Sequence, residues 1–546
     1  MPSRELDSFG VSAVRARRLP DSALTASEVT RFDAFSRAVR VFAVTVLVFA
    51  LMGIPKSPLV SLVIVGFTFV RLASAPTQCG LVWLIGLSTV LGLLHMGAGG
   101  GAIILSISGI AALAISRLSP DMVPIRWMDR ALVAQSYPGR SMTTHHVLET
   151  RAPFERLALT RALAMLQAEV PVLRTLVREA PLGMARFVAA PAATVQWLRE
   201  PIELGEFGWY QRPFDLAREA PIRVLHAPRI GGGYQLVMTL HHSATDGMGA
   251  MILLDALMRH YDRARGIGIP SPEPIESRDP GFASLLFHRG PLFAMKLAIR
   301  SAWRAPRFGT RSASLLERRE AVATETHALV TRVSRERWSL LGVQARGIGC
   351  TRNDLVLSAW LRAAADWRTL RGMPEEPFTA LVPMDLRSHV GAGGAMHNYF
   401  GALETEYDRD DIDSPELALR VSARSKKERE LNRVLTTPLM LAVLGRALPP
   451  AAFRALFRAV DQSRNAFRYS FLFSHIRVAD GIHLPESTLP EQLYCLSALP
   501  RQPGIGLTIT ALPLSVTFTL AYTPPRLSHE GARELMSCFM SRIGEL

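Results

Sequence analysis

The chain has 546 residues, more than one hydrophobic core usually organises, so several structural units are expected. Hydrophobic residues make up 49% of it and the mean hydropathy is +0.17, which is high for a wholly soluble protein and indicates a membrane portion. The net charge of +15 comes mainly from dispersed arginines, without a DNA- or RNA-binding motif. These features exclude nucleic acid as the expected partner and favour anionic lipid headgroups or the phosphates of an acyl carrier such as coenzyme A.

A basic segment, 1–38, precedes a predicted transmembrane region, 39–117. Residues 72–116 contain no Asp, Glu, Lys or Arg, and this run is long enough for two spanning helices, placed at 79–96 and 101–116. Two upstream apolar runs, 41–54 and 58–70, are each short for a full span. They are predicted to form either two tilted helices or one re-entrant hairpin, which gives two to four transmembrane helices in all.

Both interpretations give an even number of crossings, so both ends of the region should face the same side. Arginines flank it on both sides, whereas Lys56 is the only charge in the first connection. By the positive-inside rule we expect an integral protein of the inner (cytoplasmic) membrane, with the rest of the chain on the cytoplasmic side. The alternative is a buried helical bundle in a soluble protein. The apolar region begins too late and continues too long for a cleaved signal peptide.

From about residue 119 the pattern becomes mixed helix and strand. Residues 142–149 are predicted to form a strand, and 153–167 an amphipathic helix. Residues 223–226 and 234–240 are predicted to form a hairpin that turns at three consecutive glycines, 231–233. His145 and His146 are interpreted as a strand pair without chemistry, because no Asp-Gly follows at the required offset.

The sequence HHSATDG at 241–247 is an HHxxxDG motif at the end of the buried strand 234–240. A helix, 247–258, is predicted to follow it directly. A histidine delivered by a strand end is well placed to act as a general base, and His242 is the candidate. His241 is expected to pack or to orient its neighbour. The alternative is a pair of ordinary histidines in a turn.

Three further segments in the second half carry polar residues at the ends of predicted elements. Thr351-Arg352-Asn353-Asp354 opens a helix, the strand at 382–387 ends in Arg387, and Asn398 lies in the segment 396–401. In this order, together with HHxxxDG, these elements resemble the chloramphenicol-acetyltransferase-like acyltransferases. That superfamily includes non-ribosomal peptide condensation domains, and the pattern is most similar to bacterial wax ester synthase/diacylglycerol acyltransferases.

The resemblance covers about 120–546 and implies an α+β fold. Two lobes, 119–310 and 325–546, would each have a mixed sheet flanked by helices, preceded here by the helical transmembrane region. The active site would lie in a tunnel between the lobes. In that family the motif aspartate, here Asp246, points away from substrate and pairs with an arginine, for which Arg387 is one possible partner. Gly247 would allow close packing where the turn enters the helix.

The resemblance also implies substrate-binding residues. Asn398 would line the tunnel or steady the developing oxyanion, although it could equally satisfy the backbone of a glycine-rich loop. Substrate contacts are also predicted for Arg387, Thr351, Asn353, Asp354 and His475. The sequence departs from the family where His397 replaces a glycine and His475 replaces an asparagine. We therefore expect an acceptor other than a typical fatty alcohol or diacylglycerol.

The expected activity is transfer of an acyl group from a thioester to a hydroxyl of a lipid-like acceptor, with membrane lipids as partners. The donor would be acyl-CoA or an acyl carrier protein, used as co-substrate without a tightly bound cofactor. The scattered cysteines contain no C-x-x-C pair, so no metal site and no disulfide framework is predicted. Two alternatives remain open: an amide-forming condensation enzyme, and a non-catalytic membrane scaffold that binds a carrier protein or lipid.

Overall fold

The computed structural model describes residues 123–136, 142–179, 185–202, 212–270, 275, 293, 296, 312–318, 326–390, 395–431, 433–438, 441, 450–462, 469–477, 482–499, 503–511 and 516–546. Residues from Arg117 to Leu546 group as one compact unit. Within the described residues, no helix is both long enough and apolar enough to cross a membrane. The predicted basic segment, 1–38, and transmembrane region, 39–117, lie outside them, and so do most residues of 271–311.

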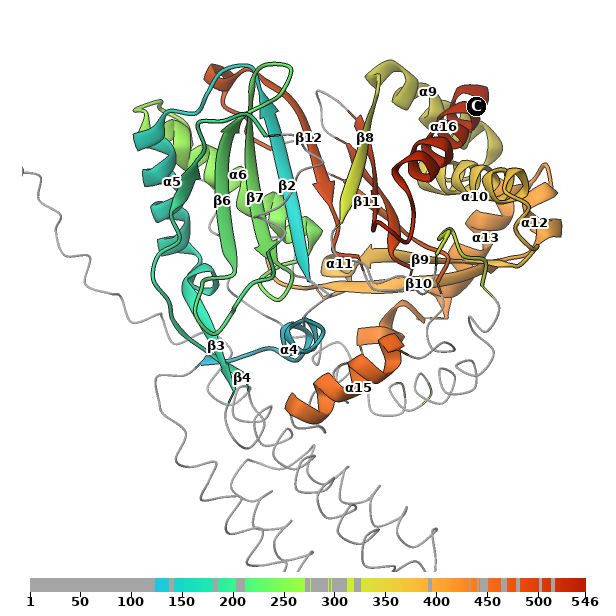
Figure 1. The fold of residues 1–546 in the computed structure, drawn as a ribbon, viewed down its shortest axis with the longest axis horizontal. Coiled ribbons are helices and arrows are strands. Elements are labelled where there is room, and N and C mark those ends of the chain that lie inside the picture. The colour runs from blue at the N-terminus through green and yellow to red at the C-terminus, as the bar shows by residue number, and fades with distance from the viewer. Residues whose placement is uncertain are drawn as a thin grey trace, which may run out of the picture. The chain divides into compact units, whose positions relative to one another are not determined.

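The first lobe is built on a five-stranded sheet with the strand order β12-β2-β7-β6-β5 (Figure 1). Helices α5 (Arg156–Glu169) and α6 (Gly247–Ala264) pack together and enclose a hydrophobic core with the sheet. The strands are β2 (Thr143–Thr150), β5 (Val195–Trp197), β6 (Ile222–Pro228), β7 (Tyr234–His241) and β12 (Pro490–Leu496). A 3-10 helix, η1 (Pro171–Arg174), follows α5.

Side-chain alternation in β7 explains how this sheet is buried on both faces. Leu236, Met238 and Leu240 belong to the core shared with α5 and α6, whereas Val237 packs on the opposite face. The predicted hairpin is confirmed, since β6 and β7 pair antiparallel. The three glycines that turn it all have a positive φ, the conformation that glycine adopts without steric cost: Gly231 (88°), Gly232 (103°) and Gly233 (78°).

The second lobe contains a six-stranded mixed sheet with the order β10-β9-β11-β13-β14-β8. Its core includes Trp360, Phe518 and Phe539, whose rings meet edge to face. The strands are β8 (His327–Val333), β9 (Phe378–Asp385), β10 (Phe400–Tyr407), β11 (Phe471–Arg477), β13 (Ile505–Ala511) and β14 (Val516–Tyr522). The helices are α9 (Arg335–Ile348), α10 (Arg352–Leu370), α11 (Arg387–Val390), α12 (Arg409–Asp413), α13 (Leu417–Glu430), α16 (His529–Glu545) and the 3-10 turns η2 (Arg433–Leu435) and η3 (Glu486–Thr488).

Strand β12 links the two lobes. It follows the second-lobe strand β11 in the chain, yet it pairs antiparallel with β2 and forms the edge of the first sheet (Figure 1). Its Tyr494 and Leu496 pack in a small core that also touches Ala328 and Val330 of β8. The predicted second lobe, 325–546, therefore contributes one strand to the sheet of the first.

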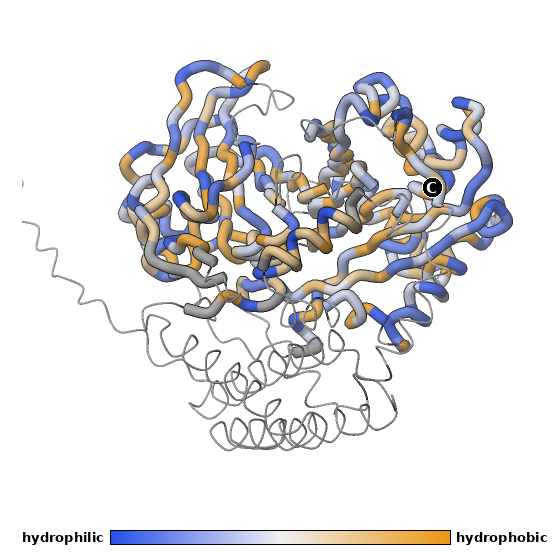
Figure 2. The backbone as a smooth tube through the Cα atoms, turned by 60° about the horizontal axis from the view of Figure 1, so that its bottom comes forward, coloured by the Kyte–Doolittle hydropathy of each residue, from blue (hydrophilic) through white to orange (hydrophobic). Residues whose placement is uncertain are grey.

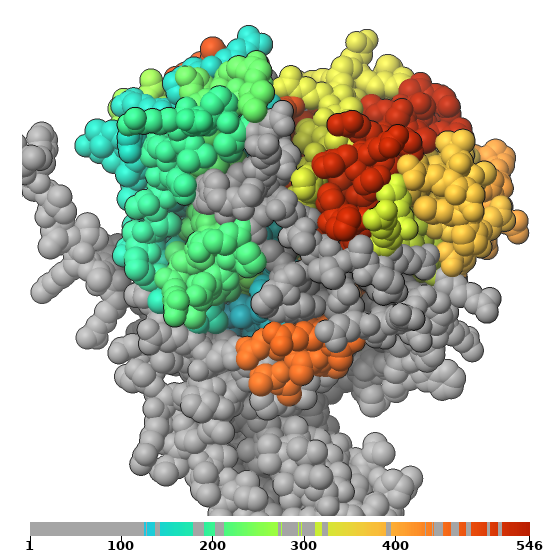
Figure 3. Space-filling view, in the orientation of Figure 1, coloured from blue at the N-terminus to red at the C-terminus, as the bar shows by residue number. Residues whose placement is uncertain are grey.

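A smaller layer lies beside the two sheets. It contains helices α4 (Trp127–Ala134) and α15 (Pro450–Gln462), which pack through a core that includes Met128, Leu132 and Phe453. The short sheet β1-β4-β3 completes it, with β1 (Val123–Pro124), β3 (Thr175–Glu179) and β4 (Ala185–Ala189). In the space-filling view α15 lies at the surface (Figure 3).

The predicted α+β class is confirmed, because the part of the chain that the structure describes forms two main sheets with flanking helices. Figure 2 shows hydrophobic positions concentrated on the inner elements and hydrophilic positions along outer helices and loops. The predicted helix at 247–258 extends to Ala264, because the apolar pattern continues through Tyr261.

Candidate active site

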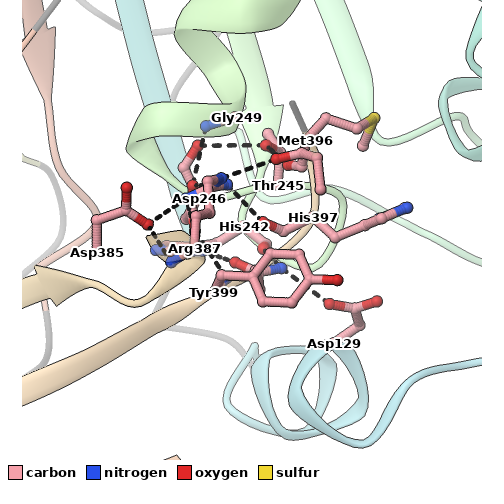
Figure 4. Close-up of polar contacts among 12 residues, drawn as sticks. Asp129, His242, Thr245, Asp246, Gly249, Asp385, Arg387, Met396, His397 and Tyr399 are labelled. Atoms are coloured by element: carbon pink, nitrogen blue, oxygen red, sulfur yellow. Dashed lines mark hydrogen bonds and ion pairs between the residues drawn. The ribbon is translucent and has the colours of Figure 1, made fainter. Parts of the chain in front are cut away.

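The turn between β7 and α6 carries the HHxxxDG motif, and Asp246 fixes its end. Asp246 is the N-cap of α6, and its Oδ1 accepts a hydrogen bond from the Gly249 amide at 2.9 Å. The same carboxylate accepts two hydrogen bonds from Arg387, at 2.7 and 3.1 Å, and one from the Tyr399 amide at 2.8 Å (Figure 4). Asp246 thus ties the first lobe to two segments of the second.

The strand predicted to end at Arg387 ends at Asp385, and Arg387 is the first residue of α11. It is the arginine partner that the resemblance suggested. Its side chain and that of Asp246 are 4% and 6% exposed, so the pair is buried. Burial alone lowers the pKa of Arg387, but the carboxylates of Asp246 and Asp385 outweigh it and raise the pKa above its ordinary value. The guanidinium also donates to the carbonyl oxygens of Ala395 and His397. It therefore holds the segment that carries Asn398.

His242 is half-buried at the end of β7, and its amide donates to the Met142 carbonyl at 2.7 Å, which extends the β2–β7 ladder. Its Nδ1 lies 3.1 Å from Oδ1 of Asn398. The Asn398 Nδ2 donates to the main-chain oxygen of His242 and to Oδ1 of Asp129, each at 2.8 Å. Because Oδ1 of Asn398 can only accept, Nδ1 of His242 carries the proton and Nε2 keeps its lone pair.

His241 points to the other face of the strand and is buried. Its Nε2 and Nδ1 lie 2.7 Å from the hydroxyls of Ser136 and Ser243, respectively. Burial, together with neighbouring His242 and Arg223, lowers the pKa of His241 to about 3. A neutral imidazole held at both nitrogens fits the predicted packing and orienting role.

Two glycines allow the start of α6 to approach the second lobe. A Cβ on Gly247 would lie 3.1 Å from Cδ1 of Ile476, in β11. A Cβ on Gly249 would overlap the Met396 carbonyl oxygen, so the backbone there would have to shift to admit any side chain. Gly247 has the predicted packing role, and Gly249 is a further requirement that the motif itself does not indicate.

The other predicted substrate-binding residues lie elsewhere in the second lobe. Thr351 and Asp354 form a capping box that starts α10, and Asn353 lies in the first turn of the same helix. The His475 ring meets the edge of Trp338 in α9 at 5.7 Å between centroids. Successive strand residues point to opposite faces, so His475 points away from α6 while Ile476 points toward it. Substrate contact by these four residues remains a prediction.

The remaining histidines near the motif have lowered pKa values. His145 and His146 in β2 are buried, and burial, with the charges of neighbouring residues, lowers the pKa of each to about 3. His397, which replaces the family glycine, also has a pKa well below its ordinary value because of burial and the charges of Arg126 and Arg387. No group of His, Cys, Asp or Glu that could hold a metal ion is present in the described part of the chain.

Sequence reasoning missed Asp129 and Ser136, which the short helix α4 brings to Asn398 and His241. A lone aspartate 269 residues before its partner gives no local signal. Only a three-dimensional arrangement reveals the contact.

No family model and no curated protein matches the sequence, but solved structures do. The first condensation domain of the calcium-dependent antibiotic synthetase aligns with a TM-score of 0.59 and 15% identity, over 78% of this chain and 96% of that one. The condensation domain of the Monacolin K polyketide synthase aligns with a TM-score of 0.54 and 14% identity, over 78% and 97%. The chain has the condensation-domain fold.

The same fold is shared by the epimerization domain from the third module of tyrocidine synthetase B. It aligns with a TM-score of 0.54 and 13% identity, over 78% of this chain and 97% of that one. At such identities the likeness shows the condensation fold alone.

Proposed function

We propose that this protein is a membrane-anchored acyltransferase that moves an acyl group from acyl-CoA or an acyl carrier protein thioester to a hydroxyl of a lipid-like acceptor. The observation that carries the proposal is His242, half-buried at a strand end with Nδ1 hydrogen-bonded to Asn398 and Nε2 left as the basic nitrogen. Within the superfamily, the segments containing Thr351, Arg387 and Asn398 favour the wax ester synthase branch.

In the proposed reaction, Nε2 of His242 takes the proton of the acceptor hydroxyl as its oxygen attacks the thioester carbonyl carbon. The tetrahedral intermediate then collapses, the carbon–sulfur bond breaks, and the thiolate takes the proton back from the imidazolium. The products are an ester and a free thiol, and His242 is regenerated. No acyl-enzyme is needed, so no serine or cysteine nucleophile is invoked.

The membrane anchor rests on the sequence. Residues 72–116 lack charge, and arginines flank the apolar region on both sides. A chain held in the inner membrane with its catalytic lobes on the cytoplasmic side would meet cytoplasmic thioesters and bilayer-dissolved acceptors together. This arrangement suits an acceptor or product that partitions into lipid.

The test is thiol release from a panel of acyl-CoA and acyl carrier protein thioesters by the detergent-purified full chain, in the presence of extracted membrane lipids. His242→Ala should lower turnover by about 10²- to 10⁴-fold, the usual contribution of a general base. His483→Ala, which removes a histidine bonded to Asp262 on α6, is the matched control and should retain activity. Equal thiol release by wild type and His242→Ala would refute the role of His242. No thiol release from any donor would favour the alternative of a non-catalytic membrane scaffold.

Amide formation is the second candidate, because condensation domains are among the structures that share the fold. Supplying amine and alcohol acceptors of matched chain length in the same assay separates the two reactions. Ester as the main product supports the proposal, whereas amide as the main product would transfer the assignment to an N-acyl condensation enzyme.

A further inference from the structure

Asp129 in α4 reaches the active site through Asn398. Its side chain is 3% exposed, and its Oδ1 lies 2.8 Å from Nδ2 of Asn398, whose Oδ1 in turn faces His242. We propose that Asp129 is a positioning residue, which fixes the direction of the Asn398 amide and thereby selects the ring nitrogen of His242 that keeps its lone pair. For turnover, this inference rests on the proposed acyl transfer.

An asparagine amide can in general occupy its site in two orientations, with oxygen and nitrogen exchanged. Here both hydrogens of Nδ2 have acceptors, the carboxylate of Asp129 and the main-chain oxygen of His242. The reversed amide would place its oxygen against both of these acceptors, so it is disfavoured. In Figure 4 Asp129 lies below His242, next to the helix that carries it.

The orientation of the Asn398 amide decides which ring nitrogen of His242 carries the proton. With Oδ1 toward the ring, Nδ1 must donate, and Nε2 is free to take a proton from an acceptor. If the amide reversed, Nδ2 would face Nδ1, the ring proton would move to Nε2, and the neutral ring would lose the base that the reaction needs. A catalytic histidine in the wrong tautomer lowers kcat even when the geometry of the site is kept.

Asp129 also places a buried carboxylate near the imidazolium that forms during the reaction. The charged and titratable groups around this region include Arg126 at the N-cap of α4, Arg130 within it, Asp246 paired with Arg387, His397, and two histidines with pKa values near 3, His146 and His241. Those two histidines are neutral at working pH. The carboxylate of Asp129 is linked to His242 by hydrogen bonds through Asn398.

The test variant is Asp129→Asn in the full chain, because an amide at 129 can donate to Oδ1 of Asn398 and so favour the reversed orientation. The matched control is Asp411→Asn, which alters a carboxylate of similar burial in the capping box of α12. We expect kcat of Asp129→Asn to fall by about 10- to 100-fold, as for other outer partners that orient a histidine, with KM nearly unchanged. The control should keep wild-type kcat, and equal losses of kcat in the two variants would overturn the inference.

A second measurement needs no substrate. The neutral imidazole of His242 reacts with diethyl pyrocarbonate, and mass spectrometry of the labelled peptide gives the reaction rate against pH. Loss of the Asp129 charge disfavours the imidazolium, so the midpoint for Asp129→Asn should lie at a lower pH than for wild type. An unchanged midpoint overturns the inference, and failure to find any thioester donor would count against the proposed function alone.

A double variant separates positioning from general destabilisation. In an Asn398→Ala background the connection is already broken, so adding Asp129→Asn should change kcat far less than it does in wild type. Fully additive losses of kcat would mean that Asp129 acts independently of Asn398 and would overturn the inference.

Discussion

Replacing Asp246 with alanine tests whether the motif aspartate holds the two lobes in register. The substitution would leave Arg387 buried without its main counter-ion, and breaking a buried pair from one side costs about 3–5 kcal/mol. It would also remove the N-cap of α6, worth about 1 kcal/mol, and the acceptor of the Tyr399 amide. We therefore expect a loss of at least about 4 kcal/mol.

Thermal unfolding followed by circular dichroism measures this loss. The entropy of unfolding is about 2.1 cal/mol/K per residue, so for the compact unit from Arg117 to Leu546 a loss of about 4 kcal/mol lowers the midpoint by about 4–5 °C. Asp385→Ala is the control, because Asp385 contacts the same guanidinium but its side chain is 40% exposed. An exposed ion pair contributes about 0–1 kcal/mol. If the two variants unfolded at the same temperature, the reasoning from burial would be refuted.

Three further predictions concern packing, acid stability and thiol reactivity. Gly249→Ala should destabilise the protein by about 1–3 kcal/mol, because its Cβ would meet the Met396 carbonyl; an unchanged denaturation midpoint would contradict this. Acid should unfold the protein early, because three buried histidines have folded-state pKa values near 3 against about 6.5 unfolded: His145, His146 and His241. Above about pH 6.5 these histidines are neutral in both states, and the free energy of unfolding is not lowered by them. As pH falls toward 3, the free energy of unfolding decreases by about 4 kcal/mol per pH unit for the three together. A denaturation midpoint that stays constant between about pH 6.5 and 4.5 would count against this prediction. Cys495 is buried and its pKa is raised to about 12, so a thiol reagent should label it only after unfolding, and labelling in the native protein would show that the site opens.

Local patterns predicted the elements around the motif well. The strand ending at His241, the helix beginning at Gly247 and the glycine turn before them each depend on a few consecutive residues, so sequence periodicity was sufficient. The Asp246–Arg387 pair was suggested by family resemblance, because 141 residues separate the partners and the chain contains many arginines.

Contacts made by isolated residues could not be predicted in this way. Asp129 and Ser136 precede the motif by more than a hundred residues and have no characteristic spacing. The capping role of Thr351 and Asp354 could have been read from the sequence, because Thr followed three residues later by Asp before an apolar run is an N-terminal helix signal. The direction of His475 depended on knowing which face of β11 meets α6.

The position of β12 has a consequence for how this protein can be divided. A fragment ending between the predicted lobes, near residue 325, would lack the strand that covers β2, and its sheet would end in an open hydrogen-bonding edge. The complementary fragment would carry β12 without β2, the strand with which it pairs. The lobes are therefore not interchangeable modules: a chimera between relatives must transfer β12 together with the first lobe, although the two are far apart in the gene.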